Sequence, residues 1–183
     1  VLTEAHNEQF GPTGLPVITS AVTIEGHGST IRRSSVSGTP EFRILAVDGN
    51  GALTLRDTTI TNGAGGYELG GAILSLGSLT LINSTVSDSS AVNGGGIASS
   101  GPLTITNSTI ADNFANWDDY GGGGGLFIGA ESHATITGSR IIDNGTYGAY
   151  GVGGGGVLVD GDATIVDSII AGNTAGGAEG RAE

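Results

Sequence analysis

The chain lacks cysteine, methionine and lysine altogether, and aromatic residues make up only 5% of its 183 positions. Without cysteine there are no disulfides, no thiolate nucleophile and no cysteine-ligated zinc. No apolar stretch approaches the roughly 20 residues that a bilayer-spanning helix needs, so the sequence predicts no transmembrane segment. The three histidines, at positions 6, 27 and 133, are scattered and form no metal-binding spacing.

Positive charge is scarce as well. Six basic residues, all of them arginine, stand against 18 acidic residues, which gives a formal net charge of −12. A surface this acidic repels nucleic acids and anionic membranes and favours divalent cations or basic surfaces. We therefore expect no nucleic-acid partner.

Glycine is abundant by contrast. There are 36 glycines, nearly a fifth of the chain, whereas ordinary proteins contain about 7%. They follow no Gly-X-Y period, which excludes collagen. They cluster instead at matching points of an internal repeat, and a repeat sets the fold before any single residue is interpreted. The repeated phrase is Leu or Ala, Thr, Leu or Ile, then a polar pair, then Ile or Val, and it occurs at 53–60, 79–86, 103–110, 134–141 and 163–170.

Each phrase predicts two short strands and a bend. In Leu103-Thr104-Ile105 apolar and polar residues alternate, as in a strand with one buried face. The polar pair that follows, such as Asn107-Ser108, is of the residue types that bend a chain. A loop of variable length comes next, and a glycine run then opens a third strand, as in Gly95-Gly96-Ile97.

Three strands a coil, repeated every 24 to 31 residues, predict an all-β fold. We expect a single-stranded parallel β-helix of about six rungs, with almost no helix, because no apolar stripe of helical period appears. At about 4.8 Å between paired strands the stack is roughly 30 Å long. One domain covers 1–183, with a degenerate N-terminal coil at 1–21 and regular coils at 22–183.

Two stretches carry a resemblance to a known group. Residues 11–20 (GPTGLPVITS) and 23–31 (TIEGHGSTI) resemble secreted bacterial right-handed parallel β-helix proteins with a CSLREA-type region. The Gly-Gly-Gly-Ile phrase at 94–97 and the Asn-Ser-Thr-Ile phrase at 107–110 are similar to repeats of chlamydial polymorphic outer-membrane proteins. The resemblance implies a right-handed coil, and export to the outside of the cell or to its surface.

The variable loops hold the sharpest local feature. One loop places the only tryptophan beside two adjacent acids, and the equivalent loop one coil later holds two tyrosines. Because successive coils stack, we expect these loops to be neighbours. Aromatic rings beside acids suit sugar stacking or a protein contact, although the rings would equally serve to pack together and shield the glycine-rich corner. The candidate binding residues are Trp117, Asp118, Asp119, Tyr120, Tyr147 and Tyr150.

Asp118 and Asp119 are also the only candidates for a metal. Ca²⁺ prefers several oxygen ligands, but nothing in the chain matches an EF-hand loop or the calcium-binding nonapeptide repeat. We expect no cofactor other than Ca²⁺ at this pair.

Three columns of polar residues follow from the repeat. Asp88, Asp112 and Asp143 lie nine residues into their coils, so they should stack about 5 Å apart, a separation that retaining glycosidases use. Every polar residue in a solenoid repeats at rung spacing, however, so a role in the turn is favoured and no catalytic residue is assigned.

The other two columns are interpreted as structural. Asn113, Asn144 and Asn173 should form a ladder of amide hydrogen bonds. An outward column of threonines, one in each phrase, would suit ice binding only with a second threonine beside it, and that second position is threonine in just two of five coils.

These features favour a non-enzymatic extracellular scaffold. The chain begins at Val1 without a signal peptide, as in a processed secreted protein or a trimmed chain. The last coil contains no complete third strand and neither end has a capping helix, so either the chain continues as a longer β-helix or one copy pairs with the next into a filament. The alternatives are a polysaccharide-binding or carbohydrate-active protein and an adhesin that binds a cell-surface protein.

Overall fold

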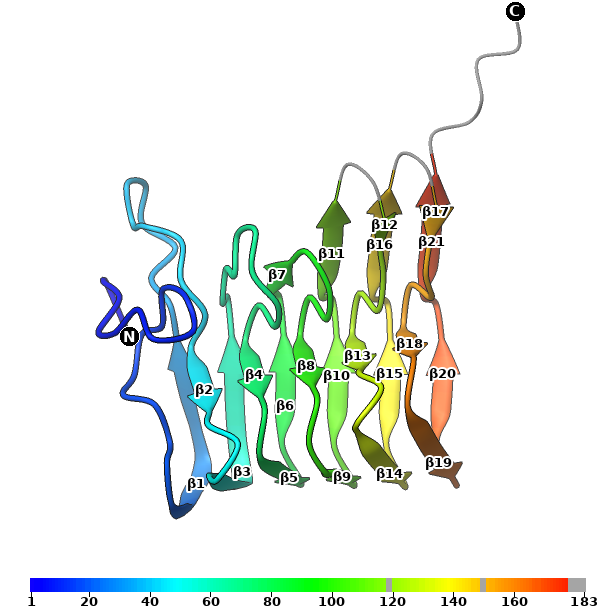
Figure 1. Cartoon of the computed structure of the whole chain (residues 1–183), viewed down its shortest axis with the longest axis horizontal. Helices are drawn as coiled ribbons and strands as arrows, with labels where there is room; N and C mark the ends of the chain where they lie inside the picture. Colours follow the sequence, from blue (N-terminus) through cyan, green and yellow to red (C-terminus); the bar gives the residue numbers. More distant parts are fainter. Residues whose placement is uncertain (118–119, 149–150, 178–183) are drawn as a thin grey trace, which may run out of the picture.

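The computed structural model describes residues 1–117, 120–148 and 151–177. They form a parallel β-solenoid of about five turns, with the opening strands of a sixth at the C-terminal end. Figure 1 shows the rungs stacked side by side along the long axis, from the N-terminus at one end to the red strands at the other. No helix occurs in these three ranges.

The largest sheet contains the two strands of each repeated phrase. Its strands pair in parallel, each with the corresponding strand of the next coil. β1 and β3 each continue through the bend of their coil. In later coils the strand is interrupted at the bend, so that two shorter strands form. The first half of the coil is formed by β1 (Ala21–Arg32), β3 (Ala52–Thr61), β5 (Ser78–Ile82), β9 (Leu103–Thr106), β14 (His133–Thr137) and β19 (Asp162–Val166), and the second half by β6 (Thr85–Ser87), β10 (Thr109–Ala111), β15 (Arg140–Ile142) and β20 (Ile169–Ala171).

A second sheet holds the strands that follow the glycine runs. It comprises β2 (Leu45–Val47), β4 (Ile73–Ser75), β8 (Ile97–Ser99), β13 (Leu126–Ile128) and β18 (Val157–Val159).

The variable corner carries two further sheets. We expected loops at this corner, but in the later coils these segments are paired strands, because equal lengths in successive coils let their backbones hydrogen-bond. We call these six strands the fin; β11, β16 and β21 rise above β10, β15 and β20 in Figure 1. They are β7 (Ser90–Ala91), β11 (Phe114–Trp117), β16 (Gly145–Gly148) and β21 (Thr174–Gly177), with β12 (Tyr120–Gly121) and β17 (Gly151–Val152).

The predicted register is confirmed throughout the largest sheet. Leu53 lies opposite Leu79, Leu79 opposite Leu103, and Leu103 opposite Ala134. The degenerate first coil also aligns as expected, with Val22 opposite Leu53. The alternation of the phrase points its apolar residues inward, where Leu55, Leu81, Ile105 and Ile136 form one fully buried column. Each buried side chain of this size contributes about 1.5–3 kcal/mol.

The polar pairs form the expected bends by adopting a left-handed backbone. The first residue of each pair has φ between 46° and 59°. Only Gly, Asn and Asp adopt this region readily, which explains why the column contains no other residue type in the five regular coils. Its members are Asp57, Asn83, Asn107, Gly138 and Asp167.

Coil length varies mainly at the fin, as expected. Between the third and fourth coils the register is offset by 24 residues at Ala91 and Ala115, but by 29 at Asn93 and Gly122, so five residues are added there. Three shorter differences were not expected. The turns before β3 and β14 each have two residues more than the corresponding turn of a neighbouring coil. β1 carries two extra residues at its bend, where its pairing with β3 shifts between Glu25 and Ser29.

The two ends of the stack differ. Residues 1–18 fold over part of the N-terminal end, although no helix caps it. Leu2 bonds the backbone of Arg32 and Ser34 at 2.7 Å each, and Ile18 pairs beside Val47, which closes a coil as the sequence predicted. At the C-terminal end the apolar side chains of β19 and β20 are exposed.

Candidate functional site

The two aromatic segments lie side by side, as the sequence predicted. β11 and β16 pair so that Asn116 lies opposite Tyr147, and Tyr120 of β12 lies opposite Gly151. Only the backbone course of Trp117 and Tyr120 is described. Asp118, Asp119 and Tyr150 lie outside the described residues, so a sugar or Ca²⁺ site at this end of the fin remains a prediction.

Phe114 and Tyr147 cover glycines on the next rung of the fin. A Cβ placed on Gly145 would lie 2.9 Å from Cδ2 of Phe114, and one placed on Gly176 would lie 3.7 Å from Cδ2 of Tyr147. The rings therefore rest on bare backbone, which agrees with the shielding role considered for this corner. Each side chain nevertheless stays more than two-fifths exposed, at 42% for Phe114 and 43% for Tyr147.

A groove of about 370 Å³ lies beside the Phe114 ring. Tyr67, which is 94% exposed, borders one end, and Phe114 with Asn116 borders the other. Glu41 and Ser90 supply polar groups between them. A further hollow of about 310 Å³ shares Tyr67 and Glu41 with this groove, and we call the two together the channel.

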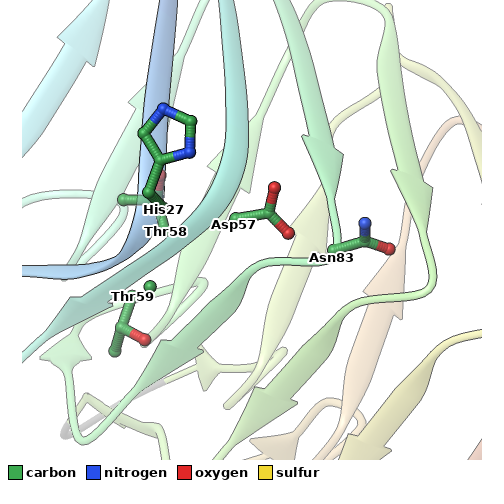
Figure 2. Close-up of a pocket in the computed structure, with 6 residues that line it drawn as sticks. His27, Asp57, Thr58, Thr59 and Asn83 are labelled. Carbon is green, nitrogen blue, oxygen red and sulfur yellow. The ribbon is translucent and has the colours of Figure 1, made fainter.

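A separate hollow of about 300 Å³ lies at the first bend of the coil. Figure 2 shows His27, Asp57, Thr59 and Asn83 around it. It arises because the two extra residues of β1, His27 and Gly28, both have positive φ and bulge outward from the rung below. Sequence reasoning missed this hollow; the two-residue surplus between Ile24 and Ile31 was the available signal.

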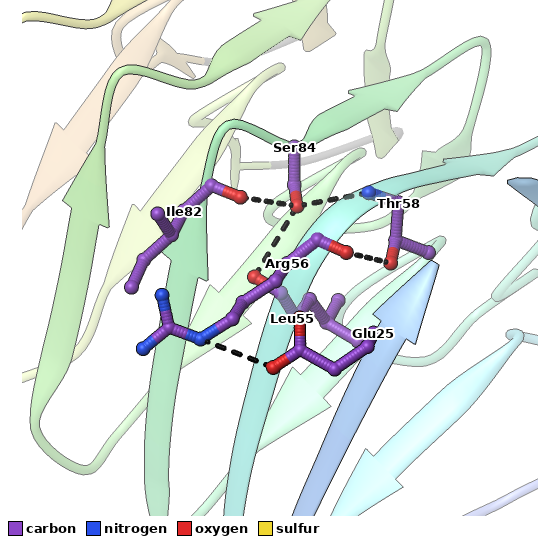
Figure 3. Close-up of polar contacts among 6 residues, drawn as sticks. All are labelled: Glu25, Leu55, Arg56, Thr58, Ile82 and Ser84. Carbon is purple, nitrogen blue, oxygen red and sulfur yellow. Dashed lines mark hydrogen bonds and ion pairs between the residues drawn. The ribbon is translucent and has the colours of Figure 1, made fainter. Parts of the chain in front are cut away.

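Behind this hollow the polar atoms are occupied in holding the bend. Figure 3 shows the Ser84 hydroxyl accepting the amide of Thr58 at 3.2 Å and reaching the carbonyls of Ile82 at 2.9 Å and Leu55 at 3.2 Å. Ser108, Ser139 and Ser168 repeat the amide contact on later rungs. These serines are therefore structural.

One ion pair lies near the same corner. Arg56 Nε is 3.4 Å from Glu25 Oε1. Both side chains are nearly half exposed, and exposed pairs stabilise a fold by about 0–1 kcal/mol, so this pair adds little.

The aspartate column has a backbone explanation. Asp88, Asp112 and Asp143 have φ of 51°, 55° and 55°, and the same column continues with Asn62 and Gly172, which share the positive φ but no charge. Asp88 also accepts a hydrogen bond from Thr61 at 3.1 Å and one from Ser87 at 2.6 Å. The backbone conformation of the turn thus explains these acids, and this is the role that the sequence favoured.

The asparagine ladder is present. Asn113 Nδ2 donates to Asn144 Oδ1 at 3.0 Å, and Asn144 Nδ2 donates to Asn173 Oδ1 at 2.9 Å. The same oxygens accept the backbone amides of Asn113 and Asn144. Both of these side chains are buried, which makes them structural rather than available to a ligand.

Arg43 is a buried charge that sequence reasoning missed. Its guanidinium donates to the carbonyl oxygens of Phe10, Leu69 and Gly70, and so ties the N-terminal segment to the second coil. Burial lowers the pKa of Arg43 from its usual value, and the charge of Glu68 partly opposes this effect. Its partners are backbone atoms far away in sequence, so no sequence motif predicts that this arginine is buried.

Neither a metal-binding cluster nor a membrane-spanning helix is found among residues 1–117, 120–148 and 151–177. No three His, Asp or Glu side chains gather there as metal ligands. No helix in these ranges is long and apolar enough to cross a membrane.

Comparison with known proteins agrees with the geometry. A family model described as the right-handed β-helix region matches residues 20–181, nearly the whole chain. No curated protein and no solved structure matches the chain significantly. The parallel coils and the buried aliphatic column fit that description, and the chain belongs to the right-handed β-helix family.

Proposed function

We propose that this β-helix is a non-enzymatic structural protein of the cell exterior, and that its copies associate end to end into filaments. β-Helix domains occur in enzymes and non-enzymes alike, so the fold by itself leaves the choice open. The observation that carries the proposal is the state of the apolar columns at the C-terminal end.

Those columns continue to the last rung described and are uncovered there. Ile136 and Ile141 are fully buried, whereas their successors Ile165 and Ile170 are 38% and 49% exposed. The outer edges of β19 and β20 have no partner among the described residues. An unpaired edge with apolar side chains is a template for another strand.

The other end offers a matching edge. The first half of β1, up to Glu25, pairs only with β3, because Leu2 covers β1 only at its end. Its Val22-Thr23-Ile24 alternates in step with residues 163–165. A second copy docked in this register continues the sheet and buries Ile165. Such a head-to-tail contact does not close on itself, and it yields a filament.

Electron microscopy and sedimentation of the purified chain test the proposal. We expect filaments, or a mass that rises with concentration. Ile165→Asp should abolish association, because it places a charge in the contact, whereas Thr135→Asp, on the exposed side of a middle rung, should not. A monomer at every concentration, or equal assembly of both variants, would overturn the proposal.

The second candidate is a carbohydrate-binding protein or an adhesin. The observation that favours it is the pairing of β11 with β16, which sets Tyr147 beside the strand that ends in Trp117. Secretion, a bacterial source and a Ca²⁺ site at Asp118 and Asp119 are part of the same proposal. A glycan array with Trp117→Ala as the comparison tests it, since a binding site that includes the indole loses its signal in that variant.

A further inference from the structure

We infer that the exposed face of the fin binds an uncharged linear glycan along the channel from Tyr67 past Phe114 to Tyr147. This inference deepens the second function proposed above. Of the binding residues that the sequence predicted, it keeps only Tyr147.

The rings offer flat apolar surfaces at regular steps. Phe114 and Tyr147 stand on adjacent rungs, about 4.8 Å apart, and each leans on the glycine of the following strand. One side of each ring is held against the sheet while the other side remains open. A pyranose ring has an apolar face of matching size, and such stacking needs a ring that is already fixed in place.

Polar groups border the same channel. Asn116 lies on the outward side of β11, opposite Tyr147, and Ser90 and Glu41 line the same groove as Phe114 and Tyr67. Amide, hydroxyl and carboxylate groups beside aromatic surfaces are the combination that orients hydroxyl-rich ligands. The groove of about 370 Å³ has room for part of such a chain, with the remainder lying along Tyr147.

The charge of the channel opposes binding of an anionic glycan. Glu41 and Glu68 border it, no arginine is among the described residues that line it, and the whole chain, which has no lysine, carries a net charge of −12. Uronic-acid and sulfated polymers would be repelled at close range.

Isothermal titration calorimetry with defined hexasaccharides tests the site. The probes are cellohexaose, laminarihexaose and maltohexaose as neutral chains, hexagalacturonate as an anionic chain and chitosan hexamer as a cationic chain. We expect at least one neutral chain to bind and hexagalacturonate not to bind. Phe114→Leu should weaken binding at least tenfold, because leucine still covers Gly145 but has no ring face. Phe114→Tyr should restore it, and Val159→Ala, on another sheet, should have no effect.

The outcomes separate the site from the function. If no neutral hexasaccharide binds, or if only the chitosan hexamer binds, the inference is wrong. If a neutral chain binds equally to wild type and Phe114→Leu but not to Trp117→Ala, glycan binding stands and this location fails. Filament formation is measured separately and does not bear on either result. A melting temperature of Phe114→Leu equal to that of the wild type verifies that the variant is folded.

Discussion

Asn113, Asn144 and Asn173 show what a single residue type does when rungs repeat it. The side-chain oxygens of Asn144 and Asn173 each accept both the amide proton and a side-chain proton of the asparagine on the rung before, and that of Asn113 accepts the amide of Ser89. The first two side chains are buried. Removing them therefore leaves hydrogen-bond donors without an acceptor where no water reaches. A stranded buried donor costs about 1–3 kcal/mol.

We predict that Asn144→Ala lowers the free energy of unfolding by about 3 kcal/mol or more. This loss exceeds the cost of one stranded donor, because two donors of Asn113 lose their acceptor. Asn173→Ala should cost less, because this residue is only half-buried and its partner strands are exposed. Urea denaturation followed by circular dichroism measures both. Equal losses in the two variants would contradict a cooperative ladder.

Substitutions in the aspartate column can show whether the turn requires only the backbone conformation or the carboxylate as well. Asp112 has φ of 55°, a conformation that costs a residue with a Cβ about 1–2 kcal/mol. We predict that Asp112→Gly keeps or raises stability, whereas Asp112→Ala lowers it by about 1 kcal/mol. Chemical denaturation of the pair checks this. A large loss in Asp112→Gly would show that the carboxylate itself matters.

At the scale of strands, glycines allow the rungs to approach closely where the coil turns into the second sheet. A Cβ on Gly124 would lie 2.1 Å from the carbonyl oxygen of Gly145 and 2.4 Å from that of Gly155. Both neighbours are backbone, which cannot move without breaking the ladder. The glycine run is therefore a packing requirement rather than a flexible linker.

We predict that Gly124→Ala destabilises the protein by several kcal/mol or prevents folding, as overpacking and lost ladder bonds combine. Gly49→Ala is the matched control, because a Cβ at Gly49 meets nothing within 4 Å. It should be neutral or slightly stabilising. Soluble yield and melting temperature of the two variants decide the matter; similar behaviour would refute the packing argument.

The strands of the coil were predictable and those of the fin were not. Alternation in phrases such as Leu103-Thr104-Ile105 is local, and the repeat length gives each partner, so sequence alone predicted the register. β11 and β16 pair because two loops happen to have equal length, and their glycines and aromatics carry no period. The hollow at His27 and the buried Arg43 likewise depend on contacts between distant rungs. Of the candidate site, the sequence foresaw that the loops are neighbours, but not the groove between Tyr67 and Phe114.

For the whole molecule, the balance of charge opposes association while the apolar end favours it. Copies that each carry a net charge of −12 repel one another. Salt screens that repulsion over about 8 Å at physiological ionic strength, and it leaves apolar burial in place. The sequence pI is about 4.3, so repulsion also declines as the pH falls towards that value.

We predict that end-to-end assembly strengthens between about 0.02 and 0.5 M NaCl, as the range of screening shortens. Sedimentation velocity at fixed protein concentration measures the change. Ile165→Asp should stay monomeric across the same range. Dissociation of the wild type by salt would instead point to ion pairs, and the apolar contact proposed here would be wrong.

The fin also makes the chain a natural display scaffold. The fourth coil accommodates five more residues than the third between Ala115 and Gly122, yet the strands on both sides keep their partners. A foreign peptide grafted at this corner of the coil would therefore not shift a buried rung. If copies join end to end, such a graft would recur along one side of the fibre at the period of one molecule.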